Sequence, residues 1–82
     1  MKIVFSDQAA IAIADAPTAV RKAFHKQLGF LEHDLRHPSL RAKKYDEAGD
    51  KWQARVNRSW RFYFKIVGDT YIIQDITPHP KK

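Results

Sequence analysis

The chain has 82 residues, of which 44% are hydrophobic and 12% aromatic, with only three glycines. This composition is typical of one small globular domain and excludes a two-domain enzyme with its own cofactor-binding fold. The absence of cysteine excludes a disulfide framework and a thiolate zinc site, and no segment is apolar enough to span a membrane, so we expect a soluble cytoplasmic protein that uses no cofactor and no metal.

The positive charge of the chain is unevenly distributed. The formal net charge is +6. Residues 1–35 carry four basic and four acidic side chains, whereas residues 36–82 carry eleven and five. Such asymmetry favours a polyanionic partner, above all nucleic acid, although a basic surface can also serve solubility alone.

The N-terminal part is predicted to form a short strand and two helices. Residues 2–5 are mainly apolar, and Ser6 is a good N-cap for a short helix rich in alanine and isoleucine. Pro17 fits the first turn of a second helix. We expect that helix to end at His37 and Pro38 and to cover a sheet with one apolar face. This face consists of Val20, Phe24, Leu28, Leu31 and Leu35.

The C-terminal part is predicted to form three strands after an irregular, polar and basic segment at 39–50. Apolar and polar residues alternate over 52–57 and over 60–66, and a two-residue hairpin signal at 68–69 precedes a last strand at 71–76. The predicted order is β-α-α-β-β-β. We therefore expect one α+β domain over residues 1–82, with two N-terminal helices packed on one face of a mainly antiparallel four-stranded sheet.

The alternation also predicts which side chains the helices leave uncovered. Residues of the polar phase must gather on the open face of the sheet, because the helices cover the apolar phase. These residues are Gln53, Arg55, Arg61, Tyr63 and Lys65. From the last strand only one acidic residue, Asp75, can join them, so we expect a basic face. The competing interpretation is a wet face whose lysines and arginines only keep the sheet soluble.

Four segments of this layout resemble a known family. They are the loop HPSLRAKK after the second helix, the strands KWQARV and WRFYFKI, and the C-terminal ITPHPKK. Together with the order of elements, they resemble the RelE/ParE superfamily of toxins over essentially the whole chain. The resemblance implies a RelE-like fold and the toxin of a bacterial or archaeal type II toxin–antitoxin system, neutralised by a cognate antitoxin protein. RelE-like members cleave mRNA in the ribosomal A site, which implies the ribosome and mRNA as further partners.

Metal-free cleavage of RNA needs three chemical roles. A base deprotonates the 2′-hydroxyl, positive groups stabilise the charge on the phosphate, and an acid protonates the leaving 5′-oxygen. By resemblance, Arg61 matches the sheet arginine of the family pattern and Arg55 matches a basic residue of the preceding strand. Gln53 stands where the best-known type has a lysine. This departure leaves the base open between Tyr63 and His79.

His79 follows the last predicted strand, near where many members of the family carry a histidine or an arginine. An ordinary histidine pKa of about 6.5 suits acid–base work, although a Pro-His-Pro tail is also typical of a mobile terminus. The predicted catalytic residues are therefore Arg61, Arg55, His79 and Tyr63. The predicted RNA-binding residues are Gln53, Lys65, Arg41, Lys43, Lys44, Arg58, Lys81 and Lys82. Trp52 and Trp60 fall on the apolar phase, which favours core packing over base stacking.

Three functions remain open at this point. The first is a ribosome-dependent mRNA endonuclease that inhibits translation, favoured by the arginines, Tyr63 and His79. The second is a ParE-like, gyrase-directed toxin without nuclease chemistry, which the missing lysine at position 53 keeps open. The third is an inactive basic relative that only binds nucleic acid.

Overall fold

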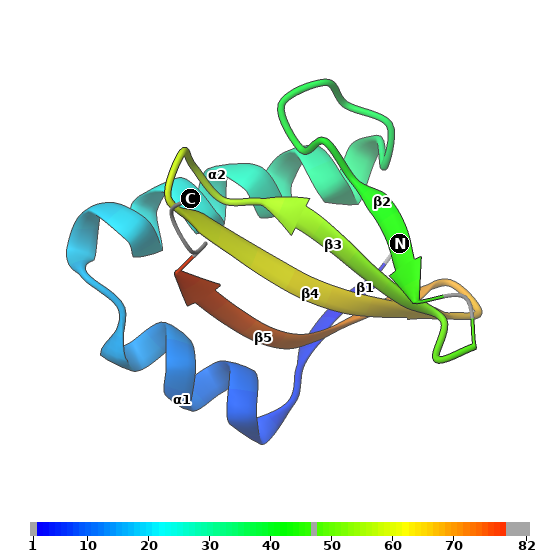
Figure 1. The fold of residues 1–82 in the computed structure, drawn as a ribbon, viewed down its shortest axis with the longest axis horizontal. Coiled ribbons are helices and arrows are strands. Elements are labelled where there is room, and N and C mark those ends of the chain that lie inside the picture. Colours follow the sequence, from blue (N-terminus) through cyan, green and yellow to red (C-terminus); the bar gives the residue numbers. More distant parts are fainter. Residues whose placement is uncertain (1, 47, 79–82) are drawn as a thin grey trace.

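The computed structural model describes residues 2–46 and 48–78, except for the side chains of Tyr45 and Asp46. The elements are β1 (Lys2–Phe5), α1 (Asp7–Asp15), α2 (Thr18–His33), β2 (Lys43–Asp46), β3 (Lys51–Arg55), β4 (Trp60–Val67) and β5 (Thr70–Pro78). The strands form one sheet in the order β1-β5-β4-β3-β2 (Figure 1). In this sheet β1 runs parallel to β5, and the other pairs are antiparallel.

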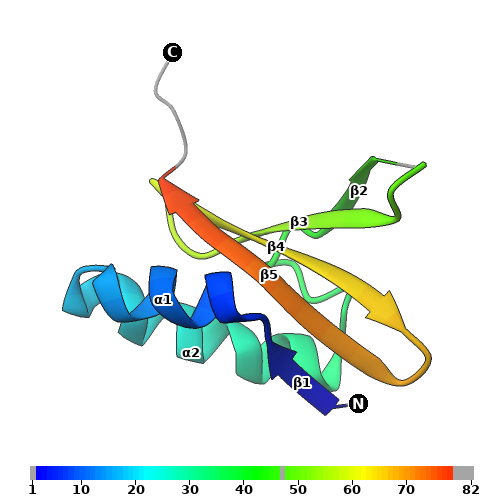
Figure 2. The same cartoon turned by 90° about the horizontal axis from the view of Figure 1, so that it is seen from below.

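Both helices cover the same side of the sheet and leave the other side open (Figure 2). This arrangement confirms the predicted α+β class and the placement of the helices. The hairpin between β4 and β5 is also confirmed, since Val67 pairs with Thr70 and Gly68 has a φ of +61°. No helix in the described ranges is long and apolar enough to cross a membrane.

The predicted number of four strands is wrong, because residues 43–46 form a fifth strand instead of an irregular segment. This strand, β2, lies at one edge of the sheet, where Lys43 pairs with Gln53 and Lys44 pairs with Trp52. The register shifts after Lys44, whose Nζ lies 2.9 Å from Oδ1 of Asp50. A short and charged edge strand lacks the apolar alternation by which strands are recognised, so the sequence pattern did not reveal it.

The two helices differ in how well their ends were predicted. Helix α1 begins after Ser6 as expected, and the Ser6 Oγ accepts a hydrogen bond from the Ala9 N–H at 3.1 Å. Helix α2 ends at His33 and not at His37. The N–H of Asp34 still donates to the Phe30 carbonyl at 2.7 Å, but the backbone of Asp34 is extended. Leu35 therefore lies beyond the helix and contacts the core from the following loop.

The core lies between the helices and the sheet. Phe24 of α2 and Phe62 and Phe64 of β4 are fully buried, and the rings of Phe24 and Phe62 meet edge to face with centroids 5.2 Å apart. The pairing of β4 with β5 shifts register between Tyr63 and Phe64. This irregularity changes the phase of β5, so that Ile73 and Ile76 are both buried although they are three residues apart.

Candidate functional site

Cross-strand pairs order the open face of the sheet into rows. Arg55 of β3 lies opposite Arg61 of β4, and in the next row Gln53 lies opposite Tyr63. Tyr63 in turn lies opposite Asp75 of β5. Directly opposed residues of neighbouring strands point to the same face. The structure therefore brings the predicted arginines, Gln53 and Tyr63 together on one surface.

A hollow of about 310 Å³ lies at the arginine end of this face, and we call it the basic cleft. It is lined by Arg41, Lys43, Gln53, Ala54, Arg55 and Arg61. Four of these six side chains are positively charged and none is acidic. None of the three arginines forms an ion pair with an acidic residue within the described parts of the chain. The cleft is therefore suited to a bound anion.

The environment of Arg61 shows the electrostatic cost of this arrangement. Burial lowers the pKa of Arg61 below its ordinary value, and the positive charges of Arg55 and Arg41 lower it further, while Tyr63 acts in the opposite direction. Each of the two lowering causes disfavours the charged guanidinium. A phosphate bound in the cleft would offset the repulsion from Arg55 and Arg41, because it places a negative charge among the arginines.

The turn between β3 and β4 holds both sheet arginines from one side. The main-chain carbonyl of Asn57 accepts hydrogen bonds from Arg61 Nη1 at 2.9 Å and from Arg55 Nε at 3.3 Å. The side-chain Oδ1 of Asn57 accepts from the N–H groups of Ser59 and Trp60 at 2.8 Å and 3.0 Å. Arg61 Nη1 also donates to the Trp60 carbonyl at 3.0 Å. One asparagine thus shapes the turn and helps to orient two guanidinium groups, and the N–H donors that these bonds leave unused can bind a ligand.

A buried glutamine joins the loop that carries Arg41 to the strand that carries Arg55. Gln27 of α2 is only 5% exposed, and its Nε2 donates to the carbonyls of Ser39 at 2.9 Å and Arg55 at 2.8 Å. The N–H of Arg55 also donates to the carbonyl of Leu40 at 2.7 Å. The backbone of Arg41 has a φ of +46°, which a residue other than glycine rarely adopts. Such a conformation persists where the surrounding contacts fix it.

A second hollow of about 310 Å³ is lined by Tyr63, which does not line the basic cleft. Its lining includes Gln8, Lys51 and Asp75. Asp75 accepts from Gln8 Nε2 at 3.0 Å and from the Ile76 N–H at 2.8 Å. The sequence prediction did not include Lys51, although it lies two residues before Gln53 in the same phase. Gln8 left no signal in the sequence, because its contact joins residues 67 positions apart.

The remaining predicted residues fall in different places. Lys43 lines the basic cleft, and Lys65 lies opposite Lys51 on the open face. Lys44 forms its ion pair with Asp50 and does not line the cleft. Arg58 is exposed in the turn after β3 and lines a wide hollow of about 460 Å³ that it shares with Arg41 and Arg55. Three predicted residues, His79, Lys81 and Lys82, lie outside the described residues.

Comparison with known proteins gives a result for structure only. No protein-family model matches the sequence, and no curated protein matches it significantly. A chain of the archaeal RelE–RelB complex from Pyrococcus horikoshii OT3 has a TM-score of 0.81 at 17% identity, covering 99% of this chain and 97% of that chain. The YoeB/ParE toxin from Agrobacterium tumefaciens has a TM-score of 0.81 at 10% identity, covering 98% and 100%.

The isolated RelE toxin of E. coli has a TM-score of 0.79 at 13% identity, covering 99% of this chain and 86% of that chain. The likeness thus extends over nearly the whole chain at an identity that supports the fold alone. The RelE-like fold implied by the sequence motifs is confirmed: this chain has the fold of the RelE-like toxins.

Proposed function

We propose that the chain is the toxin of a type II toxin–antitoxin system and that it cleaves mRNA on the ribosome without a metal ion. The observation that carries this proposal is the basic cleft, in which Arg41, Arg55 and Arg61 converge on an uncovered sheet surface. The proteins of similar structure support it. They include a RelB–RelE antitoxin–toxin complex from Methanococcus jannaschii and a YoeB–YefM toxin–antitoxin complex from Staphylococcus aureus.

The cleft suits the charge that develops during cleavage. The 2′-oxygen forms a bond to phosphorus while the bond to the 5′-oxygen breaks, which gives a 2′,3′-cyclic phosphate and a free 5′-hydroxyl. In this proposal Arg55 and Arg61 hold the phosphate oxygens, whose negative charge increases in the transition state. Because the Asn57 carbonyl already fixes both guanidinium groups, little reorganisation is needed during the reaction.

Proton transfer is assigned to Tyr63 and His79. Tyr63 lies on the open face one row from Arg61. His79 follows Pro78 in the sequence, and Pro78 pairs with Trp60 beside the arginine row. Gln53 lines the cleft, but its neutral amide cannot accept a proton from a hydroxyl group. In this proposal the base is therefore Tyr63 or His79.

The cognate antitoxin is proposed to neutralise the toxin by covering the basic cleft with an acidic segment that folds on binding. Charge complementarity should make the association rate fall as salt increases. Copurification with the product of the neighbouring gene, followed by stopped-flow association at several salt concentrations, tests this partner. A partner that left the cleft accessible would contradict the proposal.

A second candidate function follows from Gln53. Without a lysine at this position the cleft has fewer proton acceptors, which favours a ParE-like toxin that acts on gyrase and not on RNA. Toeprinting of mRNA on ribosomes, combined with a gyrase supercoiling assay, separates the two functions. We expect new mRNA ends in the A-site codon, carrying a 2′,3′-cyclic phosphate, and unchanged supercoiling. Inhibited supercoiling with intact mRNA would overturn the endonuclease in favour of the gyrase toxin.

A further inference from the structure

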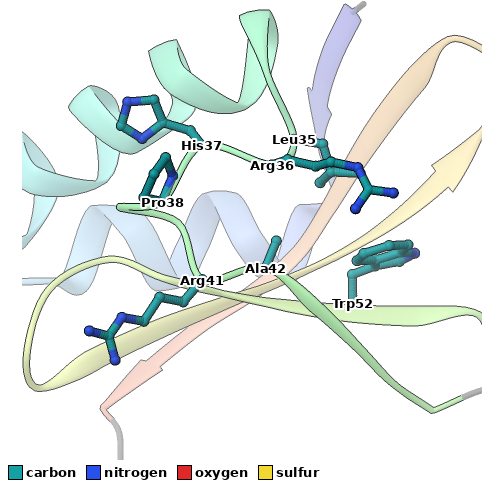
Figure 3. Close-up of a pocket in the computed structure, with 7 residues that line it drawn as sticks. All are labelled: Leu35, Arg36, His37, Pro38, Arg41, Ala42 and Trp52. Carbon is teal, nitrogen blue, oxygen red and sulfur yellow. The ribbon is translucent and has the colours of Figure 1, made fainter.

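A hollow of about 260 Å³ adjoins the basic cleft across Arg41, and we call it the tryptophan pocket (Figure 3). Its walls come from the loop between α2 and β2 and from Trp52 of β3. Arg41 lines both this pocket and the basic cleft. The two hollows lie on opposite sides of the sheet, because Trp52 pairs with the buried Phe64 whereas the cleft lies on the open face. A ligand that occupies both must therefore pass around Arg41.

Trp52 has two different surroundings. Its ring lies nearly parallel to that of the fully buried Phe64, with an interplanar angle of 17° and centroids 6.0 Å apart. This contact agrees with the core packing that the apolar phase favours. However, Trp52 is only partly buried, and it lines the pocket, whereas Phe64 does not. The indole thus contacts the core and also forms an aromatic wall of an open site.

The rest of the pocket combines apolar and positively charged groups. Leu35 and Ala42 provide apolar surface beside Trp52. The exposed Arg36 extends from the loop on the same side as Trp52, while the Arg41 side chain points to the opposite side (Figure 3). None of the residues that line the pocket is acidic. A flat, largely apolar ligand that carries negative charge at its edge matches these groups.

The loop that forms the pocket is held in place by its own contacts. The ring of His37 stacks on Phe30 with centroids 3.8 Å apart, and its Nδ1 accepts from the Ser39 N–H at 3.2 Å. The N–H of Leu40 donates to the His37 carbonyl at 3.0 Å, and the Leu40 side chain is fully buried. The pocket is therefore formed before any ligand binds, which lowers the entropy cost of binding.

We propose that the tryptophan pocket binds one unpaired base of the RNA strand whose phosphate lies in the basic cleft. The base stacks on Trp52, Arg36 contacts the edge of the base, and Arg41, whose side chain points away from Trp52, holds the phosphate on the cleft side. The inference rests on the proposed function, because that function makes RNA the ligand. Aromatic stacking together with unpaired positive charge favours a nucleotide over an apolar peptide segment.

The tryptophan content of the chain allows a direct test. The chain has two tryptophans, so Trp60→Phe leaves Trp52 as the only indole fluorophore. This variant is titrated at low salt with a short single-stranded RNA and with the same RNA made abasic. We expect saturable quenching of Trp52 by the RNA and about tenfold weaker binding of the abasic strand, as for loss of one base stack.

A second variant keeps the test independent of core packing. Arg36 is exposed, so Arg36→Ala should fold normally and should weaken binding of the RNA more than binding of the abasic strand. Lys22→Ala removes the same charge from the exposed surface of α2 and serves as the control. Equal losses in the two variants would mean that Arg36 acts only through net charge, which contradicts the proposal.

The remaining outcomes are also decisive. Equal affinity for both strands with unquenched Trp52, or binding of neither strand, would overturn the pocket while leaving cleavage on the ribosome to be judged separately. Base-dependent quenching without ribosomal cleavage would keep the pocket and overturn the proposed enzyme. Quenching of Trp52 only by the antitoxin would assign the pocket to a protein partner and contradict a nucleotide site.

Discussion

On the helix-covered face of the sheet, β4 contributes Phe62 and Phe64, which are fully buried and packed against Phe24. On the open face the same strand contributes Arg61 and Tyr63, which are only partly buried. The covered face gains stability from the burial of apolar surface. The open face instead gathers like charges, and burial together with the charges of Arg55 and Arg41 lowers the pKa of Arg61. The difference teaches that the apolar core lies on one face and that the basic side chains proposed to bind a ligand lie on the other.

The covered face should show the largest effect on stability. Phe62→Ala removes a fully buried ring from the centre of the core, so we expect the free energy of unfolding to fall by about 3–5 kcal/mol. Urea denaturation followed by circular dichroism measures this loss. A loss below about 1 kcal/mol would contradict the position of Phe62 at the centre of the core.

Gln27 connects the two faces, and its removal should affect both stability and binding. Gln27→Leu leaves the carbonyls of Ser39 and Arg55 without their donor, which should cost about 1–3 kcal/mol for each unsatisfied group. The Ser39 carbonyl lies in the loop that carries Arg41, and the other carbonyl belongs to Arg55 itself. Loss of both hydrogen bonds should therefore displace two arginines of the cleft and lower the affinity for RNA. Val20→Ala, a core change on the same helix, is the control of similar stability loss. Equal RNA affinity in both variants would mean that Gln27 does not position the cleft.

The covered face should also make the protein sensitive to alkali through Tyr71. Burial, and then the charge of Asp34, raise the pKa of Tyr71 above its ordinary value of about 10. The folded chain therefore keeps a proton that the unfolded chain loses, so stability should fall as pH rises above about 10, by at most about 1.4 kcal/mol per pH unit. Tyr71→Phe should flatten this decline in denaturation curves. An unchanged pH dependence in that variant would assign the decline to other groups.

Arg41 should show the smallest change in stability, with the opposite sign. Arg41→Gly removes both a positive charge beside Arg61 and a side chain from a residue with φ of +46°, so we expect stability to rise by up to about 1 kcal/mol. Binding of single-stranded RNA should weaken, and the slope of log affinity against log salt should decrease by about 0.7. A destabilised variant with full RNA affinity would contradict a role for Arg41 in ligand binding.

The covered face could be predicted well because its signals are local and periodic. Val20, Phe24, Leu28 and Leu31 repeat at helical spacing, and all four are buried. The helix end was missed because Leu35 continues that spacing after the backbone has left the helix. Within β4, alternation alone placed Arg61 and Tyr63 on the opposite side from Phe62 and Phe64.

The supports of the open face could not be predicted, because they depend on contacts between distant backbone groups. Gln27 reaches carbonyls 12 and 28 residues away, and nothing in the helix pattern marks it as buried. Asn57 orients two arginines through its main-chain carbonyl, which every residue has. Lys51 differs from Gln27 and Asn57, because it lies two residues before Gln53 on the same strand. Strand alternation alone was therefore sufficient to place Lys51 on the open face.

The central claim is that the basic cleft holds the reacting phosphate, and Arg61→Ala tests it most directly. Single-turnover cleavage of ribosome-bound mRNA by this variant is compared with cleavage by the wild-type chain and by Lys22→Ala, which removes a charge from α2. We expect Arg61→Ala to reduce the rate about a hundredfold or more, with folding and ribosome association retained and Lys22→Ala unaffected. Full cleavage by a folded Arg61→Ala protein would contradict the account.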